Sequence, residues 1–265
     1  MGNLFDTDDV FFSKFNAMNS DFSYLCDVLP NGYTVCDDHF MHMFDINSTK
    51  TESFNLDTHE NPKNILIASD LTPEEREKMK EVLLKKQKVF AWGYEDMPGI
   101  DREIAEHRIP THPYITLVKQ KKRRLRPEWA LLIKEKVEKQ LKARFVEVVE
   151  DTHWLANVVP APKKHGKVRM CVDYRNLNKA CPKDDFPLPH IDTLVDSAAT
   201  SAMYSFMDGF AGYNQIMMAM IDKLKTSFTT EWGVYCYLVM PFGLKNTGAT
   251  YQRMAIALLH DMSQK

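Results

Sequence analysis

The sequence predicts an α+β protein preceded by an acidic extension. Helical signals occur at 72–92 and from Pro127, whereas short β-type runs dominate after residue 145. Helices mixed with strands that follow one another along the chain are typical of α+β domains. A chain of 265 residues, 44% of them hydrophobic, is long enough for one sizeable domain with an appendage or for two small domains.

Residues 1–70 are predicted to be an irregular acidic extension. They contain twelve Asp/Glu and three Lys/Arg, a balance of −9, in a chain whose net charge is −2. No period of 3.6 or 2 persists through 1–60, where Asp, Asn, Ser and Thr are frequent. Only 61–69 is able to form a short strand there.

Residues 71–125 are predicted to be a connector with one helix. Thr72 has the position of the N-cap, Pro73 the first helical position, and Glu75 completes a capping box. Met79 and Val82 belong to an apolar stripe at helical spacing.

Residues 126–265 are predicted to form the main domain. Ala130, Ile133, Val137 and Leu141 predict a helix from Pro127. Two more helices are expected at 187–198 and in NTGATYQRMAIALLHDM. The β-type runs, separated by Gly, Pro, Lys and Asp, are FVEVV, WLANVVPA, KVRMCVDY, AMYSFMD, QIMMAM, KTSFTTEW and YCYLVM.

Two basic clusters point to a nucleic-acid partner. Residues 119–144 hold eleven basic and three acidic residues, and 163–183 hold seven basic residues against Asp173 alone. Such clusters on one domain indicate nucleic-acid binding, although a solvated helix face stays open for the first.

Several other classes are not favoured by the sequence. Five cysteines without a CxxC pair indicate a reducing compartment and no zinc ribbon. Cys36, His39 and His42 lack a fourth ligand, so we interpret them as unrelated loop residues. No apolar run reaches the length of a membrane span, and the acidic start is unlike a signal peptide.

The stretch SFMDGFAGYNQI contains the first candidate for chemistry. An apolar run delivers Asp208 to a predicted strand end, and Gly209 and Gly212 permit a tight turn or a close backbone approach. A carboxylate presented in this way suits Mg²⁺, which prefers oxygen ligands. An ordinary β-turn aspartate is the alternative.

The stretch PKKHGKVRMCVDYR predicts a cationic hairpin. Lys163 and Lys164 precede a His165-Gly166 turn, and Arg169 lies on the returning strand. Such a tip suits a polyphosphate, although lysines also keep exposed hairpins soluble. Asp173 and Arg175, two apart, are expected to share a strand face and to form a structural ion pair.

The stretch MPFGLKNTGATYQR predicts a turn that leads into a helix. Small residues at Gly243 and Gly248 would let a flat ligand or a nucleic-acid backbone approach closely. Taken alone, the stretch is equally an ordinary loop with a helix cap.

Together, in this order and spacing, the three stretches closely resemble the reverse transcriptase of plant-type gypsy LTR retrotransposons. The resemblance covers 154–196, 205–216 and 226–253, and it extends upstream through the connector, over roughly the last three quarters of the chain. It implies fingers and the N-terminal half of a right-hand polymerase palm, with an incomplete ferredoxin-like sheet. The implied activity is RNA-directed DNA polymerase.

The resemblance also implies roles for residues. Asp208 would be the first catalytic aspartate and a ligand of two Mg²⁺ ions, which assist phosphoryl transfer. Tyr213 would lie under the nucleotide sugar and exclude a 2′-hydroxyl. The other implied nucleotide-binding residues are Lys163, Lys164, Arg169, Gly209, Phe210, Phe242, Gly243 and Gln252. The predicted nucleic-acid contacts are Lys121, Lys122, Arg123, Arg124 and Arg126.

One departure limits the expected activity. The family's other catalytic carboxylates come in a Tyr-x-Asp-Asp motif, and these 265 residues contain none. We therefore expect weak or absent Mg²⁺ binding and negligible polymerase activity from the chain alone, which reads as a truncated enzyme. A non-catalytic nucleic-acid-binding remnant of a degenerate retroelement is the alternative. A second departure, at Met220 and Ile221, is expected to expose apolar surface at a bend.

The implied partners are an RNA template, an RNA–DNA hybrid, a dNTP and the remainder of a pol polyprotein, with no membrane. The cysteines and the resemblance together predict an intracellular location, either cytoplasmic in a virus-like particle or nuclear.

Overall fold

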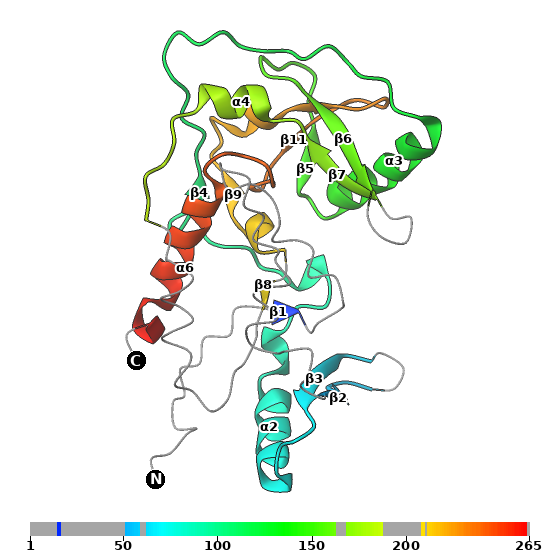
Figure 1. Cartoon of the computed structure of the whole chain (residues 1–265), viewed down its shortest axis with the longest axis vertical. Helices are drawn as coiled ribbons and strands as arrows, with labels where there is room; N and C mark the ends of the chain where they lie inside the picture. Colours follow the sequence, from blue (N-terminus) through cyan, green and yellow to red (C-terminus); the bar gives the residue numbers. More distant parts are fainter. Residues whose placement is uncertain are drawn as a thin grey trace. The chain divides into compact units, whose positions relative to one another are not determined.

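The computed structural model describes residues 15–16, 51–58, 62–162, 168–187, 208–209 and 211–263 (Figure 1). For residues 15, 16, 208 and 261–263 it describes the backbone alone. The chain divides into two compact units, one of residues 1–97 with 205–210 and the other of 98–204 with 211–265. The helix predicted at 187–198 lies, beyond residue 187, outside the described residues.

The first unit contains a β-hairpin. Strand β2 (Thr51–Asn55) pairs antiparallel with β3 (Asn64–Ala68). The strand predicted within 61–69 is therefore confirmed, whereas the prediction of irregular structure is wrong for 51–55. The hairpin buries Leu56 and Ile67. A strand of five residues offers too few alternations for its period to stand out in a polar sequence.

Helix α2 (Pro73–Lys85) begins as predicted, with its capping box formed. The Glu75 amide donates to Thr72 Oγ1 at 3.3 Å, and the Thr72 amide donates to Glu75 Oε2 at 3.0 Å. No residue of α2 is fully buried, so its apolar stripe is only half-covered. Arg76 pairs with Glu52 at 3.3 Å, which joins the helix to the hairpin.

The described residues of the first unit also form several short elements. Two 3₁₀ turns, Gln87–Val89 and Tyr94–Asp96, follow α2. Strand β1 (Phe15–Asn16) pairs antiparallel with β8 (Asp208–Gly209).

A five-stranded sheet in the order β5-β11-β10-β6-β7 organises the second unit. Strands β6 and β7 form an antiparallel hairpin, whereas β10 runs parallel to β6. Each of the five strands overlaps a predicted β-type run, and the ends of strand and run differ by up to three residues. Their bounds are β5 Val146–Val148, β6 Ala156–Pro162, β7 Val168–Val172, β10 Phe228–Thr229 and β11 Val234–Tyr237.

Helix α3 (Pro127–Lys142) packs against β5 and β7. Its stripe of Ala130, Ile133 and Val137 is buried as predicted, and Ile133 has 0% exposure. The helix therefore contributes an apolar face to the sheet while its lysines and glutamates remain in solvent.

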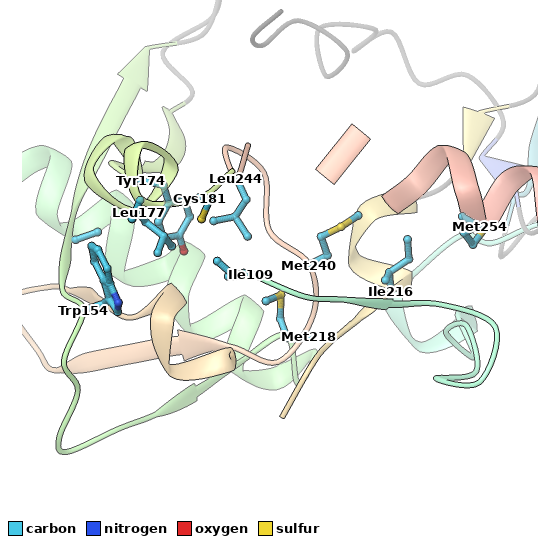
Figure 2. Packing of buried hydrophobic residues seen from close by; sticks show 12 residues of the cluster. Ile109, Trp154, Tyr174, Leu177, Cys181, Ile216, Met218, Met240, Leu244 and Met254 are labelled. Carbon is cyan, nitrogen blue, oxygen red and sulfur yellow. The ribbon is translucent and has the colours of Figure 1, made fainter. Parts of the chain in front are cut away.

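The remaining elements surround a second part of the core. Strand β4 (Glu106–His107) pairs parallel with β9 (Met217–Met218), and helix α6 (Thr247–Ser263) begins where it was predicted. Short turns occupy Gly212–Gln215 and Lys223–Thr226, and α4 (Arg175–Ala180) was not predicted. Figure 2 shows the buried cluster running from Trp154, past Ile109 and Met218, to Met254 on α6.

The described helices include none that combines the length and apolar character needed to cross a lipid bilayer.

Candidate nucleotide and nucleic-acid site

The loop at 240–246 is held in place by α4. Asn178 Nδ2 donates to the Gly243 carbonyl at 2.8 Å, and its Oδ1 accepts from the Lys245 amide at 2.9 Å. Gly243 has φ = 91°, a conformation that side chains disfavour, so the turn requires glycine. Lys245 Nζ adds a bond of 2.7 Å to the Cys181 carbonyl. These contacts fix the loop before α6 begins.

Two aromatic rings pack beside this loop, next to the ring of its own Phe242. The Tyr213 ring lies 4.9 Å from Phe242 and 5.2 Å from Tyr251. A β-carbon on Gly212 would come within 2.9 Å of the Tyr251 hydroxyl, so glycine permits this packing. The structure thus brings together Tyr213, Phe242 and Gly243, three of the predicted nucleotide-binding residues. Gln252 follows Tyr251 on α6 and is half-buried.

The surroundings of Tyr213 keep its phenol neutral. Burial raises the pKa of Tyr213, and a hydrogen bond with Thr247 opposes part of that rise. Phe242 remains 49% exposed, so one ring of the group faces solvent. A neutral half-buried ring beside an exposed one is chemically suited to stack against a flat or sugar-like ligand.

The predicted cationic hairpin is confirmed in its stem. Pro162 pairs with Val168, and Ala161 with Arg169, across β6 and β7. Arg169 is half-buried on β7. Lys163, Lys164 and the tip lie outside the described residues, so the phosphate-binding role of this hairpin stays a prediction.

Of Asp208, the residue predicted to bind metal, the structure describes only the backbone. Asp208 and Gly209 form β8 in the first unit, while Phe210 and the Asp208 side chain lie outside the described residues. Among the side chains that the structure does describe, no three His, Cys, Asp or Glu residues converge as a metal site. The described side chains therefore do not by themselves assemble a magnesium site, and we derive no catalytic step through Mg²⁺.

The five predicted nucleic-acid-binding cations differ in their surroundings. The Arg123 guanidinium lies 3.5 Å from Asp173, and that of Arg126 lies 5.9 Å from the Trp129 ring. Lys121, Lys122 and Arg124 are exposed and make no ion pair with any described residue.

The predicted ion pair between Asp173 and Arg175 is confirmed, with two bonds of 2.7 Å. The hydrogen bond from Arg175 is the main reason that the pKa of Asp173 is lowered. The predicted reason for the ion pair, a shared strand face, is wrong, because β7 ends at Val172 and Arg175 is the first residue of α4.

Sequence reasoning missed a set of hydrogen-bonded polar side chains beside β4 and β9. The buried Asp222 accepts from the Ile109 amide at 2.8 Å and pairs with Lys225 at 2.8 Å. His107, 1% exposed, hydrogen-bonds Thr250 on α6 through Nδ1 at 2.9 Å. Burial lowers the pKa of His107 to about 4, against the opposing charges of Asp222 and Asp184. No periodic pattern marks these residues, so their sequence gives no signal.

A second missed contact holds the chain after α4 to α6. Arg253 donates two hydrogen bonds to Asp184, at 2.7 and 2.6 Å, and lies 4.6 Å from the Phe186 ring. The predicted apolar exposure at the bend after β9 is confirmed, since Met220 is 62% and Ile221 84% exposed.

Comparisons with known proteins agree on one family. Residues 161–265 match the family "Reverse transcriptase (RNA-dependent DNA polymerase)". The chain is 37% identical over 94 residues to an RNA-directed DNA polymerase homolog of Oenothera berteroana, covering 36% of this chain and 66% of that protein. It is 35% identical over 108 residues to the Pol polyprotein of transposon opus of Drosophila melanogaster, covering 41% of this chain. The chain spans 11% of that polyprotein's length.

Solved structures show the same fold. A foamy viral protease-reverse transcriptase in complex with double-stranded DNA is similar with a TM-score of 0.56 and 19% identity. The similarity covers 73% of this chain and 34% of that one. A second foamy viral structure, in complex with an RNA/DNA hybrid, has a TM-score of 0.53, 18% identity, and coverage of 73% and 26%. The partial polymerase fold that was predicted is therefore confirmed.

Proposed function

We propose that the chain carries a segment of a retrotransposon-type reverse transcriptase and forms the fingers and part of the palm of an RNA-directed DNA polymerase. The group of Tyr213, Phe242 and Gly243 is the observation that carries the proposal. Phe242 and Gly243 belong to the loop that α4 holds in place, and Tyr213, from a separate stretch, packs its ring against Phe242. The gypsy-type assignment stays a prediction.

The proposed ligands are an RNA–DNA hybrid and a dNTP. The hybrid would lie against the basic segments, and the sugar of the nucleotide against Tyr213. Support for the hybrid comes from the charge of residues 119–144 and from the similar foamy viral protease-reverse transcriptase, which was solved in complex with an RNA/DNA hybrid. The remainder of a polyprotein would be a further partner, and we propose an intracellular, reducing location.

Reverse transcriptases generally use Mg²⁺, and its place in this chain belongs to the proposal. Asp208 is the residue that we propose as a ligand. One carboxylate holds a divalent ion weakly, because Mg²⁺ sites usually combine carboxylates with substrate phosphates. We therefore expect weak or absent binding of Mg²⁺ to the 265-residue chain, measured by titration calorimetry.

The nucleotide proposal is tested by dNTP affinity in the presence of an RNA–DNA hybrid whose primer lacks a 3′-hydroxyl. Tyr213→Ala should weaken dNTP binding and reduce the preference for dNTP over rNTP, because the ring that contacts the sugar is lost. Tyr114→Ala, which removes an exposed tyrosine ring, is the control. Equal dNTP and rNTP affinities in the unaltered chain would contradict the assignment of Tyr213.

The catalytic part of the proposal is tested by primer extension on an RNA template with Mg²⁺. We expect no extension by these 265 residues alone, because they contain one of the implied carboxylates. Extension that is lost in Asp208→Ala would contradict that expectation and would make the chain active by itself. Hybrid binding without any dNTP binding would favour the alternative, a non-catalytic nucleic-acid-binding protein.

A further inference from the structure

The basic segment Lys121–Arg126, called the strap below, is fastened to the five-stranded sheet through neutral side chains. It follows the Lys119 bridge to Leu155, where the chain lies parallel to the start of β6. The Gln120 amide donates to the Leu155 carbonyl at 2.8 Å. Beyond this point, two amide side chains attach the strap to the sheet.

Asn157 on β6 supplies most of these bonds. It is 2% exposed, and its Nδ2 donates to the Lys121 carbonyl at 3.0 Å. Its Oδ1 accepts from the Arg123 amide at 2.9 Å. One buried side chain thus binds the backbone of two strap residues, as a neighbouring strand would.

Gln120 completes the attachment. Its Oε1 accepts from the Asn157 amide at 3.0 Å and from Asn157 Nδ2 at 3.1 Å. Its Nε2 donates to the Asp173 carbonyl and to Asn176 Oδ1, both at 2.9 Å. All donors and acceptors of the Gln120 side-chain amide are therefore used, which fixes the orientation of this side chain.

The charges of the strap divide into two sets. Arg123 reaches Asp173, and Arg126 lies near the Trp129 ring, so both have partners within the chain. Lys121, Lys122 and Arg124 are exposed and form no ion pair with the described residues. Cations held on a fixed backbone lose less conformational freedom when they meet an anion, and this strengthens binding.

We propose that the strap is a phosphate-binding track in which Lys121, Lys122 and Arg124 contact the backbone of the nucleic acid. Gln120 and Asn157 are its positioning residues, and Arg123 serves to attach it. This inference rests on the proposed function, because it assumes that an RNA–DNA hybrid is bound. It adds which cations bind and what holds them in place.

The first test measures the affinity of the 265-residue chain for a fluorescent RNA–DNA hybrid across a range of NaCl concentrations. The variant Lys121→Gln/Lys122→Gln/Arg124→Gln should bind more weakly. Its slope of log affinity against log salt should be smaller by about 0.9 for each phosphate that the strap no longer neutralises. The matched control is Lys78→Gln/Lys85→Gln/Lys88→Gln, which removes the same charge from exposed positions in and just after α2 and should leave the slope unchanged.

The second test separates positioning from general stability. Asn157→Leu should weaken binding and reduce the salt slope in the unaltered chain, but should change neither in the triple-glutamine strap variant. Coupling of this kind shows that Asn157 acts through the strap cations. If Asn157→Leu does not fold, as its melting curve would reveal, Gln120→Met replaces it with the same expectations.

The outcomes distinguish this inference from the function on which it rests. If the unaltered chain does not bind the hybrid, the proposed function itself is wrong. If the chain binds with a steep salt slope that the strap variant retains, the strap is not the track, although the hybrid is still a ligand. If Asn157→Leu weakens hybrid binding equally in the unaltered chain and in the triple-glutamine strap variant, Asn157 is a structural residue only.

Discussion

The second unit is held together by different chemistry in its two parts. In the five-stranded sheet, Phe228 is fully buried, with the Tyr235 and Tyr237 rings 5.7 and 5.4 Å away. Beside β4 and β9, the buried side chains include His107, whose pKa burial lowers to about 4. Apolar burial is independent of pH, whereas buried ionisable groups link stability to protons. Acid should therefore loosen the β4–β9 part before the sheet.

The largest expected effect comes from the centre of the sheet. Phe228→Ala removes a buried ring and leaves a cavity, which should lower the free energy of unfolding by about 4 kcal/mol. Urea unfolding at neutral and at mildly acidic pH should give the same loss. Phe228→Leu is the matched control, with an expected loss of about 1 kcal/mol. If the loss of unfolding free energy in Phe228→Ala varies with pH, the proposed difference between the sheet and the β4–β9 part is wrong.

Next in size is the removal of Asp222. The Asp222→Ala variant leaves Lys225 and the Ile109 amide without this acceptor, and breaking a buried pair costs about 3 kcal/mol. That value is at the low end of the usual range because the Lys225 side chain retains 24% exposure. Asp185→Ala, at an exposed aspartate, should have almost no effect on urea unfolding. Equal losses in the two variants would show that the Asp222 pair contributes nothing special.

A smaller effect is expected from acid acting on His107. Its folded pKa of about 4 lies below the ordinary value of 6.5, so the unfolded chain binds more protons between these values. Stability should therefore fall as the pH decreases from about 6.5 to about 4. The expected loss between about pH 7 and about pH 5 is about 2 kcal/mol. His107→Gln, which can still hydrogen-bond Thr250, should remove this part of the pH dependence; an unchanged pH profile would contradict the assignment.

The smallest effect is expected at the exposed pair of Asp184 and Arg253. Arg253 is 47% exposed, so Arg253→Gln should lower the free energy of unfolding by less than about 1 kcal/mol. The difference should shrink further at high salt, because salt screens exposed charges. Lys179→Gln, on α4, is the control. A large loss that salt does not change would mean that the pair acts as a buried one.

Local patterns in the sequence predicted much of the fold. The capping box depends on two residues three positions apart, Thr72 and Glu75, and the buried stripe of α3 depends on a helical period. Both features are therefore visible in the local sequence. Strand β9 and the strands of the five-stranded sheet overlap predicted runs, whereas no run was predicted at the two-residue β4. The meeting of Tyr213 with Phe242 was expected from family resemblance, and no local pattern would have produced it.

What escaped prediction depends on partners distant in sequence. Gln120 and Asn157 look like ordinary polar residues until the chain brings them together, and the same holds for His107 and Thr250. A buried polar side chain is paired in nearly every protein, but the sequence does not state with what. The helix α4 was missed because RNLNKA is too short to display a period.

The order of strands in the sheet has a consequence for synthesis on the ribosome. Strand β5 pairs with β11, and β6 pairs with β10, so each waits for a neighbour made much later. At about 5 to 20 residues per second, several seconds separate the emergence of β5 from that of its partner. Pairings of such long sequence separation form slowly. During this interval the backbone N–H and C=O groups along these edges of β5 and β6 lack their final partners, which makes the nascent chain a natural client for chaperones.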